Sequence, residues 1–196
     1  MVMSAPLREG TALDDLNALA LGATDQITIE TERLLLRPLR VSDAGLIAHY
    51  TADRRVAEGT RAIPHPLPPG AAEGFVARSL AADRREDVWA IDGSHSQLAE
   101  LLGVVSLTRM EGDQSELGFW VGAGFWNTGF ATEAVAGLVA ANPHGSRTLF
   151  AEAFQDNPGS ARVLTNCGFV YLGDAESWSV ARSSRVPTWT YLRKMG

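Results

Sequence analysis

The chain has little of several features that mark particular classes of protein. Its 196 residues include one cysteine, Cys167, so no disulfide can form within it. No apolar run approaches the roughly 20 residues that a membrane-spanning helix needs, and the start of the chain lacks the charged-then-apolar layout of a signal peptide. We therefore expect a reduced, cytoplasmic protein that is not embedded in a membrane, with Cys167 as a buried structural thiol.

Basic residues and clustered metal ligands are also scarce. The chain has 17 Lys and Arg against 23 Asp and Glu, a net charge of -6. Binding to nucleic acid by counterion release needs a basic surface, so we expect no nucleic acid partner. The histidines show no pair at the spacing of helical metal ligands, so we also expect no metal site; they are His49, His65, His95 and His144.

The apolar pattern predicts one α+β domain that follows an N-terminal arm. Residues 1–26 are the arm, which is either a frayed terminus or a short helix packed on the domain or on a second subunit. Residues 27–196 are the domain, in which a mixed, mostly antiparallel central sheet is flanked by helices. Strands are expected near 27–38, 88–91, 101–107, 115–121, 147–154, 169–172 and 188–193, and helices near 44–50, 71–84, 131–142 and 158–167. Ser42 and Asp43 are expected to cap the first of these helices.

A loop of small residues stands between a predicted strand and a predicted helix, over residues 121–134. Several backbone N–H groups converge there at the positive end of a helix dipole, which is an arrangement that binds phosphate. Glycine-rich loops are also common for purely structural reasons. Neither the Walker pattern nor the glycine spacing of a dinucleotide-binding loop occurs in the chain.

Three sequence blocks resemble one known family in order and spacing. Trp126–Ala134 is similar to the acyl-CoA pyrophosphate loop of the GCN5-related N-acetyltransferases (GNAT), in the form typical of the RimJ/RimL-like branch that contains ribosomal-protein N-terminal acetyltransferases. Asn157–Phe169 resembles that branch's Asn-x-x-Ser-x-x-Val-Leu helix and the Gly-Phe start of the next strand. Thr31–Pro38 resembles its opening block. The resemblance implies a GNAT-type acyl-CoA N-acyltransferase fold whose sheet splays after the fourth strand.

The resemblance also implies acetyl-CoA as co-substrate and a set of residues that contact it. Backbone groups at the end of a strand would pair with the pantetheine amides like an added strand, and loop amides with one hydroxyl would hold the pyrophosphate. Glu133 would point away from the phosphates and hold the loop. The cofactor contacts implied in this way are Phe119, Trp120, Val121, Trp126, Asn127, Thr128, Gly129, Phe130, Ala131, Thr132, Asn157 and Arg162.

The implied chemistry is attack of a neutral amine on the acetyl thioester. Glu116, on the strand before the loop, resembles the family's strand glutamate and is the candidate base, acting directly or through water. Many relatives have a tyrosine as acid where this chain has Leu164, and the branch has a serine one turn earlier, which is Ser160 here. The simpler interpretations are a surface glutamate and a helix-capping serine.

The sequence therefore predicts an acetyl-CoA-dependent N-acetyltransferase that works by direct transfer in a ternary complex. The acceptor is a protein N-terminal α-amine or a small-molecule amine. The Pro-rich loop over residues 63–70, the helix after it and the hairpin over residues 178–187 are expected to line its side of the site. The alternative is a non-catalytic acyl-CoA sensor with the same fold. The resemblance also leaves a homodimer open, because dimers are common in this branch.

Overall fold

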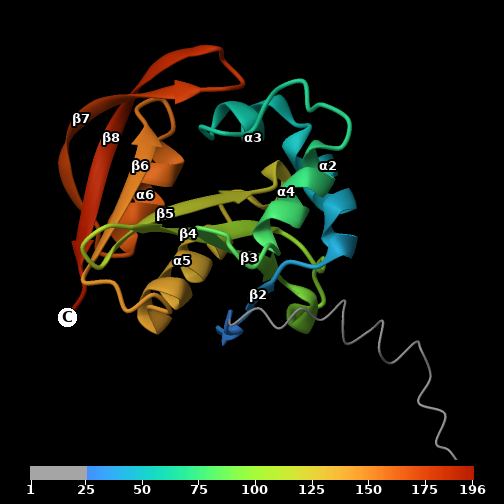
Figure 1. The fold of residues 1–196 in the computed structure, drawn as a ribbon, viewed down its shortest axis with the longest axis horizontal. Coiled ribbons are helices and arrows are strands. Elements are labelled where there is room, and N and C mark those ends of the chain that lie inside the picture. The colour runs from blue at the N-terminus through green and yellow to red at the C-terminus, as the bar shows by residue number, and fades with distance from the viewer. Residues whose placement is uncertain (1–25) are drawn as a thin grey trace, which may run out of the picture.

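The computed structural model describes residues 26–196, so the expected arm lies almost wholly outside the described residues. These residues form a sheet with the strand order β1-β2-β3-β4-β5-β6-β8-β7, antiparallel except where β5 pairs with β6 (Figure 1). The expected α+β architecture is confirmed. The strands are β1 (Ile29–Glu30), β2 (Leu35–Pro38), β3 (Glu86–Asp92), β4 (Gly103–Met110), β5 (Gln114–Val121), β6 (Thr148–Phe154), β7 (Val170–Ser179) and β8 (Ser184–Lys194).

Helices cover both faces of this sheet. One core contains residues from α5 (Phe130–Ala141) and α6 (Pro158–Asn166), and the other contains residues from α2 (Ala44–Thr51) and α4 (Ala71–Ser79). Alternate residues of β3 face the two cores: Trp89 packs in the first and Val88 in the second. A strand buried on both faces reads as a continuous apolar run, which is the pattern that the sequence has here. None of the helices in the described range is long and apolar enough to span a membrane.

Two local predictions differ from the structure. The strand expected over residues 27–38 is broken by a turn. In this turn the Leu34 N–H donates to Thr31 Oγ1 at 3.1 Å, and the backbone N–H of Thr31 donates to the Leu34 carbonyl. Asp43 does not cap α2 with its side chain. Its carboxylate instead accepts from the buried Arg37 guanidinium at 2.9 Å, because a buried guanidinium needs a charged partner, and from the Arg40 N–H at 2.7 Å, one turn before α2.

The five-residue helix α3 (Arg54–Glu58) was missed by the sequence analysis. Asp53 caps it by accepting from the Arg55 N–H at 2.9 Å. A helix of this length has little more than one turn, so its apolar residues cannot show a period.

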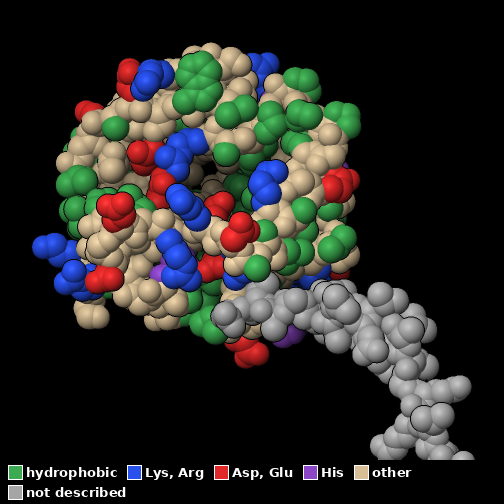
Figure 2. Space-filling model, in the orientation of Figure 1, with side chains coloured by type: hydrophobic (Ala, Val, Ile, Leu, Met, Phe, Trp, Pro, Cys, Tyr) green, Lys and Arg blue, Asp and Glu red, His purple; other side chains and the backbone are tan. Residues whose placement is uncertain are grey.

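The parallel strands β5 and β6 pair along only half of their length. Their register runs from Gln114 opposite Thr148 to Leu117 opposite Ala151, and beyond this point residues 118–121 have no partner on the β6 side. The splay implied by the family resemblance is therefore confirmed. It follows the fifth strand and not the fourth, because the single strand expected over residues 27–38 is two strands, β1 and β2. A hollow opens here on the face shown in Figure 2, between α3 and the β6–β8 side of the sheet.

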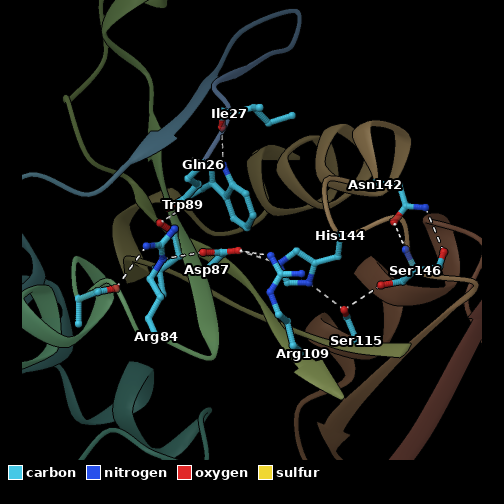
Figure 3. Close-up of polar contacts among 12 residues, drawn as sticks. Gln26, Ile27, Arg84, Asp87, Trp89, Arg109, Ser115, Asn142, His144 and Ser146 are labelled. Atoms are coloured by element: carbon cyan, nitrogen blue, oxygen red, sulfur yellow. Dashed lines mark hydrogen bonds and ion pairs between the residues drawn. The ribbon is translucent and has the colours of Figure 1, made fainter. Parts of the chain in front are cut away.

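A buried polar cluster fixes the opposite end of β5 (Figure 3). The ring of His144 lies between Ser115 and Asp87, with Nδ1 2.9 Å from Ser115 Oγ and Nε2 2.8 Å from Asp87 Oδ2. Asp87 also accepts from Arg84 at 2.6 Å and from Arg109 at 3.2 Å. The cluster joins β3, β4 and β5 to the loop between α5 and β6.

The hydrogen bonds of this cluster define the state of the His144 ring. The Asp87 carboxylate can only accept, so Nε2 carries the proton and a neutral Nδ1 accepts from the Ser115 hydroxyl. Burial lowers the pKa of His144 below 6.5 and outweighs the bond to Asp87 that raises it. Although a serine, a histidine and an aspartate meet here, Ser115 is only 1% exposed, so the cluster has no access for a substrate and its role is structural.

We expect His144→Gln to flatten the pH dependence of stability. The folded pKa is depressed, so the stabilisation is fully present above about pH 6.5 and is lost as the pH falls below that value, where the unfolded histidine binds protons. Denaturant unfolding from pH 7.5 to 5 should show a smaller fall in the free energy of unfolding for the variant. The exposed His95, changed to Gln, is the control and should behave as wild type. Equal pH slopes for wild type and His144→Gln would contradict this account.

Candidate functional site

A cavity of about 800 Å³ lies where β5 and β6 separate. Its walls come from the end of β5, the loop and first turn of α5, the start of α6, α3 and the turn between β7 and β8. It is lined by twelve of the residues that the sequence analysis singled out, namely Phe119, Trp120, Val121, Trp126, Asn127, Gly129, Phe130, Ala131, Thr132, Asn157, Ser160 and Arg162. Thr128 and Glu116 are not among its lining residues.

The loop before α5 presents a row of free backbone donors. The Glu133 N–H donates to the Gly129 carbonyl at 3.0 Å, whereas the N–H groups of residues 127–132 have no acceptor within the described range. Gly129 has a φ of 86°, in the left-handed region that favours glycine, and it directs the chain into the helix. The Thr128 hydroxyl donates to the Phe125 carbonyl at 2.6 Å and so stabilises the loop itself. Free donors at a helix N-terminus form an anion site.

Glu133 holds this loop from behind, as the sequence analysis expected. Its carboxylate accepts from Thr31 Oγ1, from the Arg33 N–H and from Arg33 Nε, each at 2.7 Å. Burial would raise the pKa of Glu133, but these hydrogen bonds outweigh it and the pKa lies below its ordinary value. Arg33 also donates to the Thr128 carbonyl at 3.2 Å and lies 4.5 Å over the Phe130 ring. Thr31 and Arg33, from the opening sequence block, thus support the loop before α5.

The free edge of β5 forms the adjacent wall. Residues 118–121 pair with β4 on one side only, so their other edge faces the cavity. Trp126 joins the loop to this edge, because its indole N–H donates to the Val121 carbonyl at 2.8 Å. Arg55 of α3 lies 5.5 Å over the Trp126 ring. An unpaired strand edge can take an extended amide chain as an added strand.

The start of α6 closes the other side of the cavity. Asn157 caps the helix by accepting from the Ser160 N–H at 3.2 Å, as expected, and its side chain also lines the cavity. The Ser160 hydroxyl has no hydrogen-bond partner within residues 26–196. Arg162 lines the cavity and its guanidinium makes no ion pair within the same range. Cys167 is buried 3.4 Å from the Thr132 carbonyl, and burial raises the pKa of its thiol, so it is a structural thiol as expected.

Glu116 lies beside this cavity in an ion pair that the sequence analysis missed. Arg61, in the segment after α3, donates to the carboxylate of Glu116 and, at 3.2 Å, to that of Glu152 on β6. Ser177 of β7 donates to the same Glu152 oxygen at 2.5 Å. The partners come from four distant segments, so no local sequence signal could have brought them together.

The β7–β8 turn closes the cavity against α3. The Val180 N–H donates to the Arg61 carbonyl at 2.9 Å. Arg182 donates to the Glu58 carbonyl at 2.8 Å and pairs with Asp156 at 2.5 Å. Within residues 26–196, no group of three His, Cys, Asp or Glu side chains is arranged to hold a metal ion.

Comparison with known proteins agrees with this geometry. A family model described as "Acetyltransferase (GNAT) domain" matches residues 33–170. No curated protein sequence matches the chain. Among solved structures, RimL, a ribosomal L7/L12 alpha-N-protein acetyltransferase in complex with coenzyme A, has 16% sequence identity and a TM-score of 0.73, covering 86% of this chain and 98% of its own.

Two further solved structures share the fold at low identity. Spermidine N-acetyltransferase from Vibrio cholerae, in complex with CoA and spermine, has 17% identity and a TM-score of 0.66, over 82% of this chain and 95% of its own. The Microcin C7 self immunity acetyltransferase MccE, in complex with acetyl-CoA and AMP, has 15% identity and a TM-score of 0.71, over 84% and 93%.

We expect Glu133→Ala to destabilise the protein by about 1–3 kcal/mol, because it leaves the partly buried donors of Thr31 and Arg33 without their acceptor. The measurement is the free energy of unfolding in denaturant. Glu32→Ala, an exposed glutamate in the same turn, is the matched control and should change stability by less than about 0.5 kcal/mol. Equal effects of the two substitutions would show that Glu133 does not support the loop.

Proposed function

The chain belongs to the GNAT acetyltransferase family, and from that premise we propose that it transfers the acetyl group of acetyl-CoA to a primary amine. The observation that carries this proposal is the row of free N–H groups over residues 127–132, next to the free edge of β5. Together they offer donors for a pyrophosphate and an edge for a chain of amides. This geometry suits acetyl-CoA as co-substrate.

We propose that each wall of the cavity binds a different part of acetyl-CoA. The pyrophosphate would accept from the N–H groups before α5, and the pantetheine amides would pair with Phe119, Trp120 and Val121. The Arg162 guanidinium is available for a further phosphate oxygen. A chain with a net charge of -6 can bind a polyanion in this way because the attraction comes from local donors and not from its overall charge.

The transfer step needs a base and a proton donor. A protonated amine has no lone pair, so its proton must leave before the nitrogen attacks the acetyl carbon, and Glu116 is the proposed acceptor of that proton, directly or through water. The C–S bond then breaks, the CoA thiolate takes a proton from Ser160, and Ser160 regains a proton from the nitrogen as the amide forms. Its hydroxyl lines the cavity and is free of other hydrogen bonds among the described residues.

A second candidate function is an acyl-CoA sensor without turnover. The observations that favour it are the ion pair that engages Glu116 and the buried Leu164, which cannot donate a proton.

We place the chain in the RimJ/RimL-like branch on its three sequence blocks. Its acceptor is proposed as a protein α-amine or a small-molecule amine.

We expect Ala131→Asp to weaken acetyl-CoA binding by about tenfold or more, because it places a carboxylate among the proposed phosphate donors. An acidic residue in the first turn of α5 interacts favourably with the helix dipole. Because Ala131 packs against the core, circular dichroism checks that both variants are folded. Ala131→Asn has nearly the same shape without the charge and serves as the control. Isothermal titration with acetyl-CoA should separate the two variants. Equal affinities would place the pyrophosphate elsewhere.

We expect Glu116→Gln to lower kcat about 100-fold at neutral pH, because it removes the proposed base. Ser160→Ala should lower kcat with a smaller effect, because water can replace the hydroxyl. The dissociation constant of acetyl-CoA should stay the same in both variants. Steady-state thiol release with an amine acceptor measures kcat. Undiminished turnover by Glu116→Gln would assign the base to another residue.

A further inference from the structure

Two carboxylates face each other at the point where β5 and β6 separate. Glu116 stands opposite Phe150 in the parallel register, and Glu152 lies two residues further along β6, so both side chains project from the same face of the sheet. Glu116 is one of the β5 residues that pair with β6, whereas Glu152 is the first residue of β6 after this pairing ends. Side chains of both signs surround the hollow on this face (Figure 2).

One guanidinium neutralises both carboxylates. Arg61 gives one N–H to Glu116 and another to Glu152. Its backbone is held by the bond from the Val180 N–H, but its side chain is 47% exposed, against 25% for Glu116 and 24% for Glu152. Ion pairs of such exposed groups contribute only about 0–1 kcal/mol, so the guanidinium can leave at small cost.

We propose that Glu116 and Glu152 together bind the ammonium group of the acceptor, and that Arg61 occupies their cation site until the acceptor displaces it. This inference rests on the proposed function and deepens it. A primary ammonium carries the same single charge as the guanidinium and has three N–H donors for two carboxylates. The exchange therefore leaves the charge of the cluster unchanged.

The two carboxylates have different tasks in the bound state. Ser177 donates a hydrogen bond to Glu152 and fixes its carboxylate, which anchors the ammonium. Glu116 takes one proton from the ammonium, and the neutral nitrogen then forms the N–C bond to the acetyl carbon as the C–S bond breaks. The thiolate takes a proton from Ser160, and the second proton that the nitrogen loses on becoming an amide returns to Ser160. Glu116 afterwards returns its proton to water, so protons and charges balance.

This cation site selects the chemical class of the acceptor. The site suits an amine with no anionic group close to the ammonium, such as a peptide N-terminus or an aliphatic polyamine. A free α-amino acid would bring its own carboxylate next to Glu116 and Glu152, and like charges at this distance repel. Arg61 thus acts as a specificity-determining residue, because only a cation can replace it.

The test measures acceptor binding to protein saturated with CoA, which cannot react. The probes are butane-1,4-diamine and an alanine tripeptide amide, each titrated calorimetrically into wild type, Arg61→Met and Glu152→Gln. Methionine keeps an unbranched aliphatic side chain in place of the charged one, so Arg61→Met should bind both probes about fivefold more tightly, equivalent to about 1 kcal/mol. Glu152→Gln should bind both more weakly than wild type. Tighter binding of one probe would show whether the acceptor is a peptide N-terminus or an aliphatic polyamine.

Two controls separate the site from general charge effects. Arg147→Met removes a guanidinium that is 79% exposed and paired with Asp113, and it should bind the probes as wild type does. The N-acetylated tripeptide, which has no ammonium group, should not respond to Arg61→Met. The proposal is overturned if Arg61→Met binds the probes no more tightly than wild type, if neither protein binds them, or if either control shows the same gain.

Thiol release from acetyl-CoA with the same probes distinguishes this inference from the proposed function. Tighter binding by Arg61→Met without any thiol release would leave the ammonium site standing and reject acetyl transfer. Thiol release with unchanged binding in Arg61→Met would keep acetyl transfer and reject the role of Arg61.

Discussion

The separation of β5 from β6 after Leu117 and Ala151 is the constraint on which the rest of the structure depends. The first halves of these two parallel strands are paired, and their carboxyl-terminal halves separate at the same end of the sheet. The buried cluster around His144 stabilises the paired end, and the cavity lies at the separated end. The same divergence leaves an unpaired strand edge and brings two carboxylates to the place where the strands part. Sheet geometry thus positions both the proposed cofactor edge and the proposed acceptor site.

A second constraint concerns how an acidic protein holds an anion. The donors over residues 127–132 are backbone groups, and they stay free because Glu133 fixes the loop from the opposite side. That carboxylate would repel an anion if it were unpaired, but Arg33 neutralises it and Thr31 donates to it. The opening block of the domain, far from the loop in sequence, therefore supports the proposed anion site.

The sequence predicted those parts of the site whose contacts are local. The strand–loop–helix order over residues 114–141 and the Asn157 cap depend on neighbours within a few residues, and both occur in the structure. Arg61 could not be predicted, because its partner Glu116 is 55 residues away and both lie in segments joined only by the fold. Asp43 does not cap α2 for a different reason: its carboxylate binds the buried guanidinium of Arg37, six residues earlier, and the Arg40 N–H.

The central claim is that the separated strands bring acetyl-CoA and an amine together for direct transfer. The most direct measurement follows acetyl-CoA labelled with ¹³C in its acetyl group by NMR, in the presence of wild-type protein and the alanine tripeptide amide or butane-1,4-diamine. The account predicts that the thioester signal is replaced by an N-acetyl amide signal, in equal amount to the CoA thiol released and only when an amine is present. A thioester that persists in the presence of bound protein and both amines would contradict it.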